Sequence, residues 1–241
     1  MSGIEDKLKG QTAIVTGAGR GIGRGIAMTL AARGVNVALV ARTDEQICSV
    51  KSEIKSQGGV AEAFPMDITD DSQITSLLEK TAERFGGLDI LVNNAGIVRL
   101  LSAVETSAED WDQTMAVNVR APFVLCRQAI PYLKQRANPH IINITSALAI
   151  KSYVGHAAYS SSKHALLGMT RTLAKEVNDM GILVHVIHPG GVDTGMRFDE
   201  DRSILMNPQP IADAVVFLLT MEGSGTVDEI RVRRTAGEPW V

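Results

Sequence analysis

The chain has 241 residues, of which 45% are apolar and 21% charged, so it has the balance of an ordinary globular protein and the length of one large α/β domain. Its net charge of −3 provides no general attraction to nucleic acid or to anionic membranes, and neither is expected as a partner. The N-terminal stretch is too polar for a signal peptide and no apolar run is long enough to span a bilayer, so a cytoplasmic location is expected.

The predicted elements alternate between short apolar strands and amphipathic helices. Strands are expected at residues 12–16, 35–41, 60–66, 88–92, 140–145, 182–187 and 227–232. Helices are expected from the glycine-rich turn to residue 34 and at 44–57, 70–85, 107–135, 159–178 and 210–221. Pro122 is expected to kink or break the fourth of these helices. Continuous apolar strands in strict alternation with helices predict an α/β fold: a doubly wound parallel sheet of about seven strands with helices on both faces.

Glycines gather directly after the first predicted strand, at Gly17, Gly19, Gly21 and Gly23. In open α/β sheets this turn is where the pyrophosphate of a dinucleotide binds, because glycine lets the backbone approach and the helix N-terminus offers free N–H groups. The spacing is G-x-x-x-G-x-G rather than the usual G-x-G-x-x-G. A glycine-rich turn without a ligand is the alternative, and the position after the first strand favours the dinucleotide site.

The second strand ends in Ala41 and Arg42, where enzymes that select NAD place an acidic residue for the ribose 2′-hydroxyl. An arginine instead suits the 2′-phosphate of NADP, and Arg20 can add a second cation. Asp44 is expected to cap the following helix. NADP(H) is therefore the preferred cofactor and NAD(H) a possible one, while the alternative for Arg42 is a solvated surface side chain.

Tyr159 and Lys163 are placed on one face of a predicted helix, because residues four apart are neighbours there. A nearby ammonium favours the phenolate and lowers the phenol pKa, which suits a proton donor to a carbonyl group. Ser146 follows a predicted strand and can stabilise charge on a substrate oxygen. Asn118, within a predicted helix, faces solvent or distorts the helix to hold a water. The stretch 93–96 ends another strand at the same edge of the sheet, as a ligand contact or a simple turn.

The combination of TGAGRGIG (16–23), NNAG (93–96), Asn118, Ser146, YSSSK (159–163) and HPGGVDTG (188–195) resembles the motifs of single-domain short-chain dehydrogenases/reductases in order and spacing. The resemblance covers nearly all of the chain and extends to 3-oxoacyl-(acyl-carrier-protein) reductases. It implies one Rossmann-type NAD(P)-binding catalytic domain over residues 1–241. In the catalytic set, it implies that Tyr159 exchanges the proton, Lys163 lowers its pKa and binds the nicotinamide ribose, Ser146 orients the carbonyl, and Asn118 holds a water of a proton relay.

The same resemblance implies a set of cofactor contacts around the catalytic residues. This set is Gly17, Gly19, Arg20, Gly21, Ile22, Gly23, Arg42, Asp67, Ile68, Asn94, Ala95, Gly96, Tyr159, Lys163, Pro189, Gly190, Val192 and Thr194. Asp67 would meet the adenine and Thr194 the nicotinamide end. It also implies a homodimer or homotetramer that pairs through helix 107–135 and the Tyr159 helix. Cys48, Cys126 and the scattered histidines lack metal-ligand spacing, so no metal site is expected.

The expected function is NADP(H)-dependent reduction of a carbonyl group, or oxidation of the alcohol, with a 3-oxoacyl thioester as the first substrate class. Small ketones, hydroxy acids and polyols are alternatives, because the C-terminus departs from the V-D-G-G pattern of many members and segment 195–208 is short. A basic patch for a carrier protein, or simply two solvated helix faces, is indicated by Lys134, Arg136, Arg171 and Lys175. Trp111, Met196, Phe198 and Met206 are candidate pocket residues, with ordinary packing as the alternative. A non-catalytic NADP(H) sensor and an epimerase or dehydratase are the other classes considered.

Overall fold

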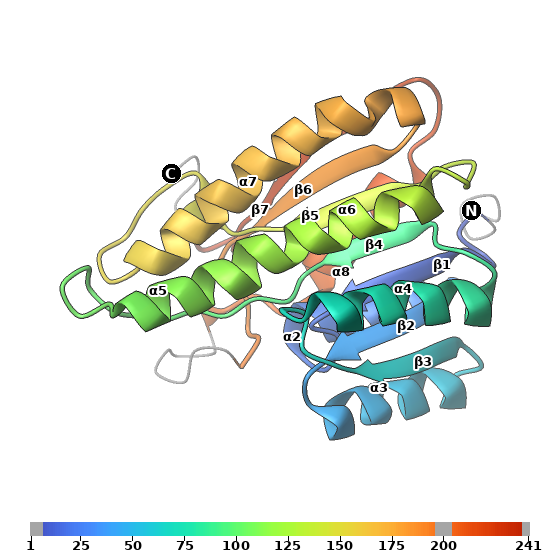
Figure 1. Ribbon diagram of the computed structural model, residues 1–241, viewed down its shortest axis with the longest axis horizontal. Helices are drawn as coiled ribbons and strands as arrows, with labels where there is room; N and C mark the ends of the chain where they lie inside the picture. Colours follow the sequence, from blue (N-terminus) through green and yellow to red (C-terminus); the bar gives the residue numbers. More distant parts are fainter. Residues whose placement is uncertain (1–6, 196–203, 238–241) are drawn as a thin grey trace.

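A seven-stranded parallel sheet forms the centre of the molecule in the computed structural model, which describes residues 7–195 and 204–237 (Figure 1). The strand order is β3-β2-β1-β4-β5-β6-β7, and every neighbouring pair is parallel. The strands are β1 (Thr12–Thr16), β2 (Asn36–Ala41), β3 (Val60–Pro65), β4 (Ile90–Asn93), β5 (His140–Ile144), β6 (Leu183–Pro189) and β7 (Glu229–Val232). The order reverses between β1 and β4, which is the point where such sheets open a ligand crevice at the carboxyl ends of the strands.

Helices cover both faces of the sheet, as predicted. One face packs against α2 (Gly21–Ala31), α3 (Asp44–Ser56) and α8 (Gln209–Thr220), which bury an apolar cluster that includes Leu30, Ile47 and Val215. The other face packs against α4 (Asp71–Phe85), α6 (Ala121–Leu133) and α7 (Ala157–Val177), with Leu78 and Leu125 in its core. Strands β1, β4 and β5 are buried along their whole length because both faces are covered.

The predicted helix 107–135 is interrupted by a π-helical turn. It consists of α5 (Ala108–Met115), the π-turn η1 (Ala116–Arg120) and α6, and the irregularity comes just before Pro122. Pro122 has no N–H to bond the carbonyl four residues earlier, which belongs to Asn118, and its ring crowds that carbonyl. The backbone N–H of Ala121 donates to the carbonyl of Ala116, five residues earlier, as in a π-helix. The predicted break is thus confirmed, and it falls at Asn118 rather than at the proline itself.

Other differences from the sequence-based boundaries are one to three residues at element ends. Short 3₁₀ turns, η2 (Ala147–Ala149) and η3 (Asn178–Met180), flank α7. The expected role of Asp44 as a cap is wrong: the N-cap of α3 is Thr43, and Asp44 is the first helical residue, whose carboxylate accepts from the Cys48 thiol. Asp70 caps α4, where its carboxylate accepts from the backbone N–H groups of Ser72 and Gln73.

Candidate active site

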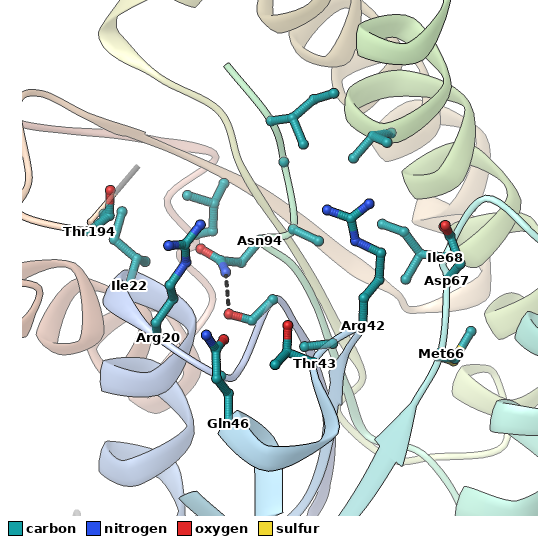
Figure 2. Close-up of a pocket in the computed structure, with 18 of the residues that line it drawn as sticks. Arg20, Ile22, Arg42, Thr43, Gln46, Met66, Asp67, Ile68, Asn94 and Thr194 are labelled. Carbon is teal, nitrogen blue, oxygen red and sulfur yellow. Dashed lines mark hydrogen bonds between the residues drawn. The ribbon is translucent and has the colours of Figure 1, made fainter. Parts of the chain in front are cut away.

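A cleft of about 390 Å³ opens at the carboxyl edge of the sheet, where the strand order reverses (Figure 2). This volume is in the range of small-molecule and cofactor sites. The described residues that line it come from the ends of β1 to β5, from the first turns of α2 and α3, from η1 and α7, and from the segment after β6. They are Gly17, Gly19, Arg20, Ile22, Ala41, Arg42, Thr43, Gln46, Met66, Asp67, Ile68, Asn94, Ala95, Gly96, Ile97, Val117, Ile144, Thr145, Tyr159, Lys163 and Thr194.

The glycine-rich turn needs glycine for close packing as well as for backbone conformation. A Cβ atom added to Gly23 would lie 2.2 Å from the carbonyl oxygen of Gly17, a contact that no side chain tolerates. Gly17 and Gly21 have φ angles of 66° and 53°, in the left-handed region. Within the described residues no side chain caps the N-terminus of α2 and no acidic residue lies in its first turn. These N–H groups therefore fit the pyrophosphate of a dinucleotide.

Two arginines flank the floor of the cleft. Arg20 lies beside Ile22 and Thr194, whereas Arg42 projects from the end of β2 toward Asp67 on the other side (Figure 2). The Arg20 Nη1 donates to the carbonyl of Gly195 at 3.2 Å. In the described ranges no carboxylate forms an ion pair with the Arg42 guanidinium. A cation placed this way at the end of the second strand fits an anionic group of the adenosine half of a cofactor.

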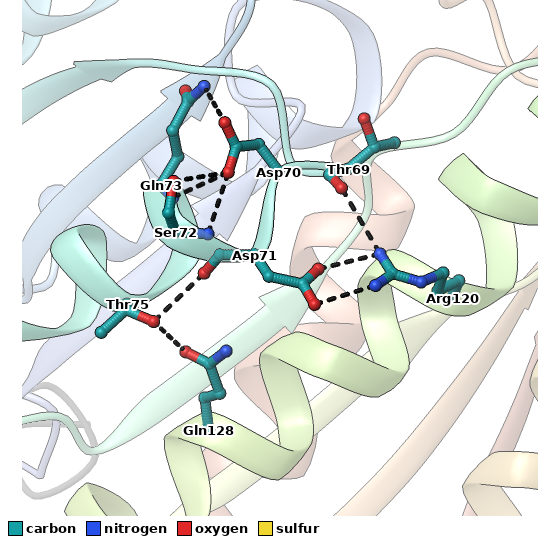
Figure 3. A network of polar contacts seen from close by, with 8 residues as sticks. All are labelled: Thr69, Asp70, Asp71, Ser72, Gln73, Thr75, Arg120 and Gln128. Atoms are coloured by element: carbon teal, nitrogen blue, oxygen red, sulfur yellow. Dashed lines mark hydrogen bonds and ion pairs between the residues drawn. The ribbon is translucent and has the colours of Figure 1, made fainter.

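Asp67 and Ile68 border the cleft beyond Arg42, as the sequence predicted. The Asp67 carboxylate accepts hydrogen bonds from the backbone N–H and the hydroxyl of Thr69, at 2.9 and 2.8 Å. The loop continues into Asp71, whose carboxylate accepts two parallel hydrogen bonds of 2.8 Å from Arg120 (Figure 3). This bidentate pair ties the Asp67 loop to η1 and so links the two sides of the cleft.

Asn94 and Ala95 are fixed by β1. The Thr16 hydroxyl accepts from both of their backbone N–H groups at 3.0 Å, and the Asn94 side-chain amide donates to the Thr16 carbonyl at 2.9 Å. Part of the NNAG motif is therefore structural: it joins the two strands at which the order reverses. Gly96 follows in close contact with the site, since an added Cβ would lie 3.2 Å from Asn118 Oδ1 and 3.5 Å from Lys163 Nζ.

Tyr159 and Lys163 line the inner wall of the cleft from the N-terminal half of α7. The Lys163 ammonium is 5.7 Å from the centre of the Tyr159 ring and donates to the Ile144 carbonyl at 3.1 Å. Only 3% of Lys163 is exposed, and burial lowers the pKa of its ammonium from 10.5 to about 8. An ammonium held beside a phenol in a partly dry wall is the arrangement that facilitates proton transfer by the phenol.

Asn118 is fully buried at the π-turn and connects three segments of the site. Its amide oxygen accepts from the N–H of Ile97 at 2.8 Å, and its amide nitrogen donates to the Ile97 carbonyl at 2.9 Å and to the Ser162 hydroxyl at 3.0 Å. Ser162 in turn donates to the Tyr159 carbonyl at 2.7 Å. The side chain thus secures the loop after β4 and the helix that carries Tyr159, and Pro122 leaves the backbone carbonyl of Asn118 without its usual helical donor.

Ser146 follows β5 and caps the short turn η2. Its backbone is extended and its hydroxyl accepts from the Leu148 N–H at 3.2 Å. Its exposed fraction is 8%. The expected catalytic set is thus brought to one edge of the sheet: Asn118 from η1, Ser146 from the end of β5, and Tyr159 with Lys163 from α7.

Some predicted residues lie beside the cleft rather than along it. Gly21 and Gly23 allow the close packing of the glycine-rich turn. An added Cβ on Gly21 would lie 2.9 Å from the Thr194 side chain. Gly190 donates from its backbone to Val232 at 2.7 Å, and Val192 bridges to Met206. Neither these two nor Pro189 is among the described lining residues, so their contact with a cofactor stays a prediction.

Of the candidate pocket residues, Met196 and Phe198 lie outside the described residues. Trp111 is half-exposed on α5, and Met206 packs against the core. Sequence reasoning missed Thr43 and Gln46, which line the cleft beside Arg42. Their signal was their position at the start of the helix that follows the second strand, where N–H groups and short polar side chains face a ligand.

The predicted basic patch does not border the cleft, because none of its four residues is among the described lining residues. The Arg136 guanidinium forms an ion pair with Asp89 at 2.7 Å, just before β4 begins, and therefore lies at the edge opposite the cleft. Arg171 pairs with Glu229 at 2.9 Å. Over residues 7–195 and 204–237, no helix is long and apolar enough to cross a membrane. The same residues contain no group of three or more potential metal ligands.

Comparisons with known proteins agree with this geometry. A family model described as short chain dehydrogenase matches residues 11–203. The 3-oxoacyl-(acyl-carrier-protein) reductase FabG of Thermotoga maritima is 30% identical over 236 residues, which cover 93% of this chain and 96% of that protein. A dehydrogenase/reductase from Sinorhizobium meliloti shares 38% identity and superposes with a TM-score of 0.89, over 96% of this chain and 97% of that one.

A metagenomic short-chain oxidoreductase solved in complex with NADP is 34% identical, with a TM-score of 0.85 over 95% of this chain and 99% of that one. One class of protein fits the sheet order, the cleft, the placement of the expected catalytic residues and the likeness to these proteins. The chain belongs to the short-chain dehydrogenase family and is an NAD(P)-dependent oxidoreductase.

Proposed function

We propose that this protein reduces a carbonyl group to an alcohol, and catalyses the reverse oxidation, with NADP(H) as cofactor and a 3-oxoacyl thioester as substrate. The observation that carries the proposal is the pairing of Tyr159 with the buried Lys163 ammonium, 5.7 Å from its ring, at the wall of a cofactor-sized cleft. A non-catalytic sensor has no use for a lysine that burial makes costly to charge.

The residues of the site divide the work of carbonyl reduction. Tyr159 gives its phenolic proton to the substrate oxygen, and Lys163 stabilises the phenolate that remains. Ser146 donates a hydrogen bond to the same oxygen and stabilises the charge that develops there. Asn118 holds the Tyr159 helix in place and presents its carbonyl to a water that restores the proton. The bound cofactor supplies the hydride.

The choice of NADP rests on Arg42 and its surroundings. The guanidinium extends from the end of β2 with Thr43 beside it, and Gln46 of α3 lies on the Arg20 side of the cleft (Figure 2). These groups fit a 2′-phosphate through charge-assisted hydrogen bonds, and Arg20 adds positive charge on the other side. The likeness to a metagenomic relative solved with NADP supports the same choice.

The thioester substrate is supported by the likeness to the Thermotoga maritima reductase, at 30% identity. Docking of a carrier protein through Lys134 and Arg136 has no support, because these residues follow α6 at the edge of the sheet opposite the cleft. A thioester not delivered through this patch, such as a coenzyme A thioester, fits the structure better. Small ketones, hydroxy acids and polyols are the alternative substrates.

A homodimer or homotetramer is proposed from the outer face of α5, η1 and α7. These elements lie side by side in Figure 1, and an apolar groove there is lined by Met115, Val119, Phe123 and Met169. Phe123 is 48% exposed. Such a surface suits an isologous contact. Light scattering that shows a monomer at working concentration would contradict this.

The experiment is the initial rate of acetoacetyl-CoA reduction with NADPH and with NADH at equal concentrations. A rate with NADPH far above that with NADH supports both the cofactor and the substrate class. Turnover of small ketones or polyols alone would replace the substrate class. An equal or higher rate with NADH would contradict the role of Arg42.

A further inference from the structure

His188 is a fully buried histidine one position before Pro189, and its ring faces the strand end that carries Ser146. It is 1% exposed. Its Nδ1 lies 2.7 Å from the Thr145 hydroxyl and 3.3 Å from the Ser146 carbonyl oxygen. Its Nε2 lies 3.1 Å from a carboxylate oxygen of Glu229. The imidazole therefore spans the gap between β7 and the backbone of Ser146.

Glu229 connects this histidine to the surface. Its carboxylate pairs with Arg171 of α7 at 2.9 Å and with Arg231 of β7 at 3.6 Å. The titratable and charged groups around His188 are thus Glu229 and Arg231 on β7 and, through Glu229, Arg171 on α7. The end of β5 contributes only the Thr145 hydroxyl and the Ser146 carbonyl. His188 thus contacts β5 and β7 directly, and Glu229 connects it to α7.

The contacts of Thr145 restrict the states that the ring can adopt. The Thr145 hydroxyl has one proton, and both the Ile187 carbonyl, at 3.0 Å, and His188 Nδ1 lie within reach of it. With a neutral ring that is protonated at Nε2, which lies 3.1 Å from the Glu229 carboxylate but outside hydrogen-bond geometry, Thr145 donates to Nδ1. With a doubly protonated ring, Nδ1 donates to Thr145 and Thr145 donates to Ile187. Whether His188 Nδ1 carries a proton therefore decides how the strand end before Ser146 is bonded.

We propose that His188, oriented by Glu229, is a positioning residue that holds the Thr145–Ser146 strand end so that the Ser146 hydroxyl meets the substrate oxygen. The inference rests on the proposed function, because it assigns Ser146 that contact. His188 is 1% exposed, and it contacts the backbone carbonyl of Ser146 rather than the Ser146 hydroxyl. It therefore acts through Ser146 rather than on the reacting atoms.

Burial lowers the pKa of the His188 imidazole below its ordinary 6.5, although the Glu229 carboxylate opposes the shift. The neutral ring is then the working form at pH 7, and protonation reverses the Thr145 hydrogen bond as the pH falls. Activity limited by this step declines on the acid side, with a midpoint below pH 6.5. Removing the titrating ring moves that acid limb.

The test compares His188→Gln and Glu229→Gln with the matched control His185→Gln. His185 is on the same strand and 1% exposed, but its ring bonds to His140 and to the Val227 carbonyl, away from Ser146.

We expect a fall in kcat of roughly 10- to 100-fold for His188→Gln and Glu229→Gln, since small misplacements cost this much. NADPH affinity, measured by cofactor fluorescence, stays within about twofold, and the acid limb of kcat shifts. His185→Gln retains both kcat and the acid limb. Glu229 is 25% exposed, whereas His188 is 1% exposed, so the Glu229→Gln variant carries the test if His188→Gln does not fold.

A double-mutant cycle with Ser146→Ala separates this inference from the proposed function. If His188 acts through Ser146, the double variant is no slower than Ser146→Ala alone. Losses that multiply independently would overturn the inference while leaving the role of Ser146 intact. A fully active Ser146→Ala would instead refute that role directly, and the positioning of Ser146 with it. An unchanged acid limb in His188→Gln, or equal losses in His185→Gln, would show a merely structural histidine.

Discussion

The Lys163 ammonium donates a hydrogen bond to the Ile144 carbonyl at 3.1 Å and so fastens α7, which carries Tyr159, to the end of β5. This contact brings a cation into a position where only 3% of its residue is exposed. Desolvation lowers its pKa from 10.5 to about 8, so charging it costs on the order of 3 kcal/mol. The protein retains a destabilising charge at the place where catalysis requires one.

Lys163→Met is expected to inactivate the enzyme and to stabilise its fold. Below pH 8 the variant no longer charges a buried group, and the free energy of unfolding of the cofactor-free protein rises by about 1–3 kcal/mol. Between pH 8 and 10.5 the unfolded wild-type chain binds a proton that the folded chain has released, so wild-type stability increases with pH there. The variant lacks that increase. Urea unfolding at pH 7 and pH 10 measures both effects, and a destabilised variant with the wild-type slope would contradict them.

Arg42→Ala is expected to weaken NADPH binding roughly 10- to 100-fold, the loss of a charge-assisted contact to the 2′-phosphate. NADH has no such phosphate, and its dissociation constant stays unchanged. Arg33→Ala is the matched control, because that side chain bonds to the Thr29 carbonyl at 3.1 Å, near the opposite end of α2. Titration calorimetry measures the dissociation constants of both cofactors. Equal losses of affinity for NADPH and NADH would show that Arg42 does not select between them.

Gly23→Ala is expected to break the turn, since the added methyl would lie 2.2 Å from the Gly17 carbonyl oxygen. We expect a markedly lower melting temperature and loss of NADPH binding. Gly168→Ala is the contrasting change: this glycine is within α7, and an added Cβ meets nothing within 4 Å among the described residues. Alanine there stabilises the helix by about 0.5–1 kcal/mol. Thermal unfolding that ranks the two variants the other way would contradict the assignment.

Asn118→Leu is expected to destabilise the protein and to slow turnover. The change leaves the N–H and carbonyl of Ile97 without their partners, at about 1–3 kcal/mol for each buried group. It also frees Ser162, which bonds to the Tyr159 carbonyl. Asn138→Ala, an exposed position after α6, serves as the control and leaves the urea midpoint unchanged. A stable, fully active Asn118→Leu would contradict the role of this residue.

The fold was predictable because most strands are largely apolar runs and each helix ends at a glycine or a polar stretch. The position of Ser146 at the carboxyl edge was predictable because it follows a strand, whereas Tyr159 and Lys163 were assigned through the resemblance to short-chain dehydrogenases/reductases. The π-turn at Asn118 was harder to locate. Pro122 predicts an irregularity in the helix. The carbonyl that lacks a donor because of Pro122 belongs to Asn118, four residues earlier, and the position of the π-turn is seen only in the structure.

Other features depend on contacts between distant segments. The pairing of His188 with Glu229 joins residues 41 positions apart, and no local pattern announces it. Thr43 and Gln46 line the cleft because the fold places the start of α3 beside the glycine-rich turn. An added Cβ on Gly19 would lie 2.8 Å from the Gln46 side chain, which shows how closely these segments approach.

The most direct test of the central claim is the turnover of Tyr159→Phe with NADPH and a carbonyl substrate that the wild-type enzyme reduces. The substitution removes one hydroxyl and leaves the ring beside Lys163. We expect the kcat of Tyr159→Phe to fall about 10²- to 10⁴-fold with NADPH affinity unchanged, because the proton donor is lost and the cofactor site is intact. Full turnover by Tyr159→Phe would contradict it.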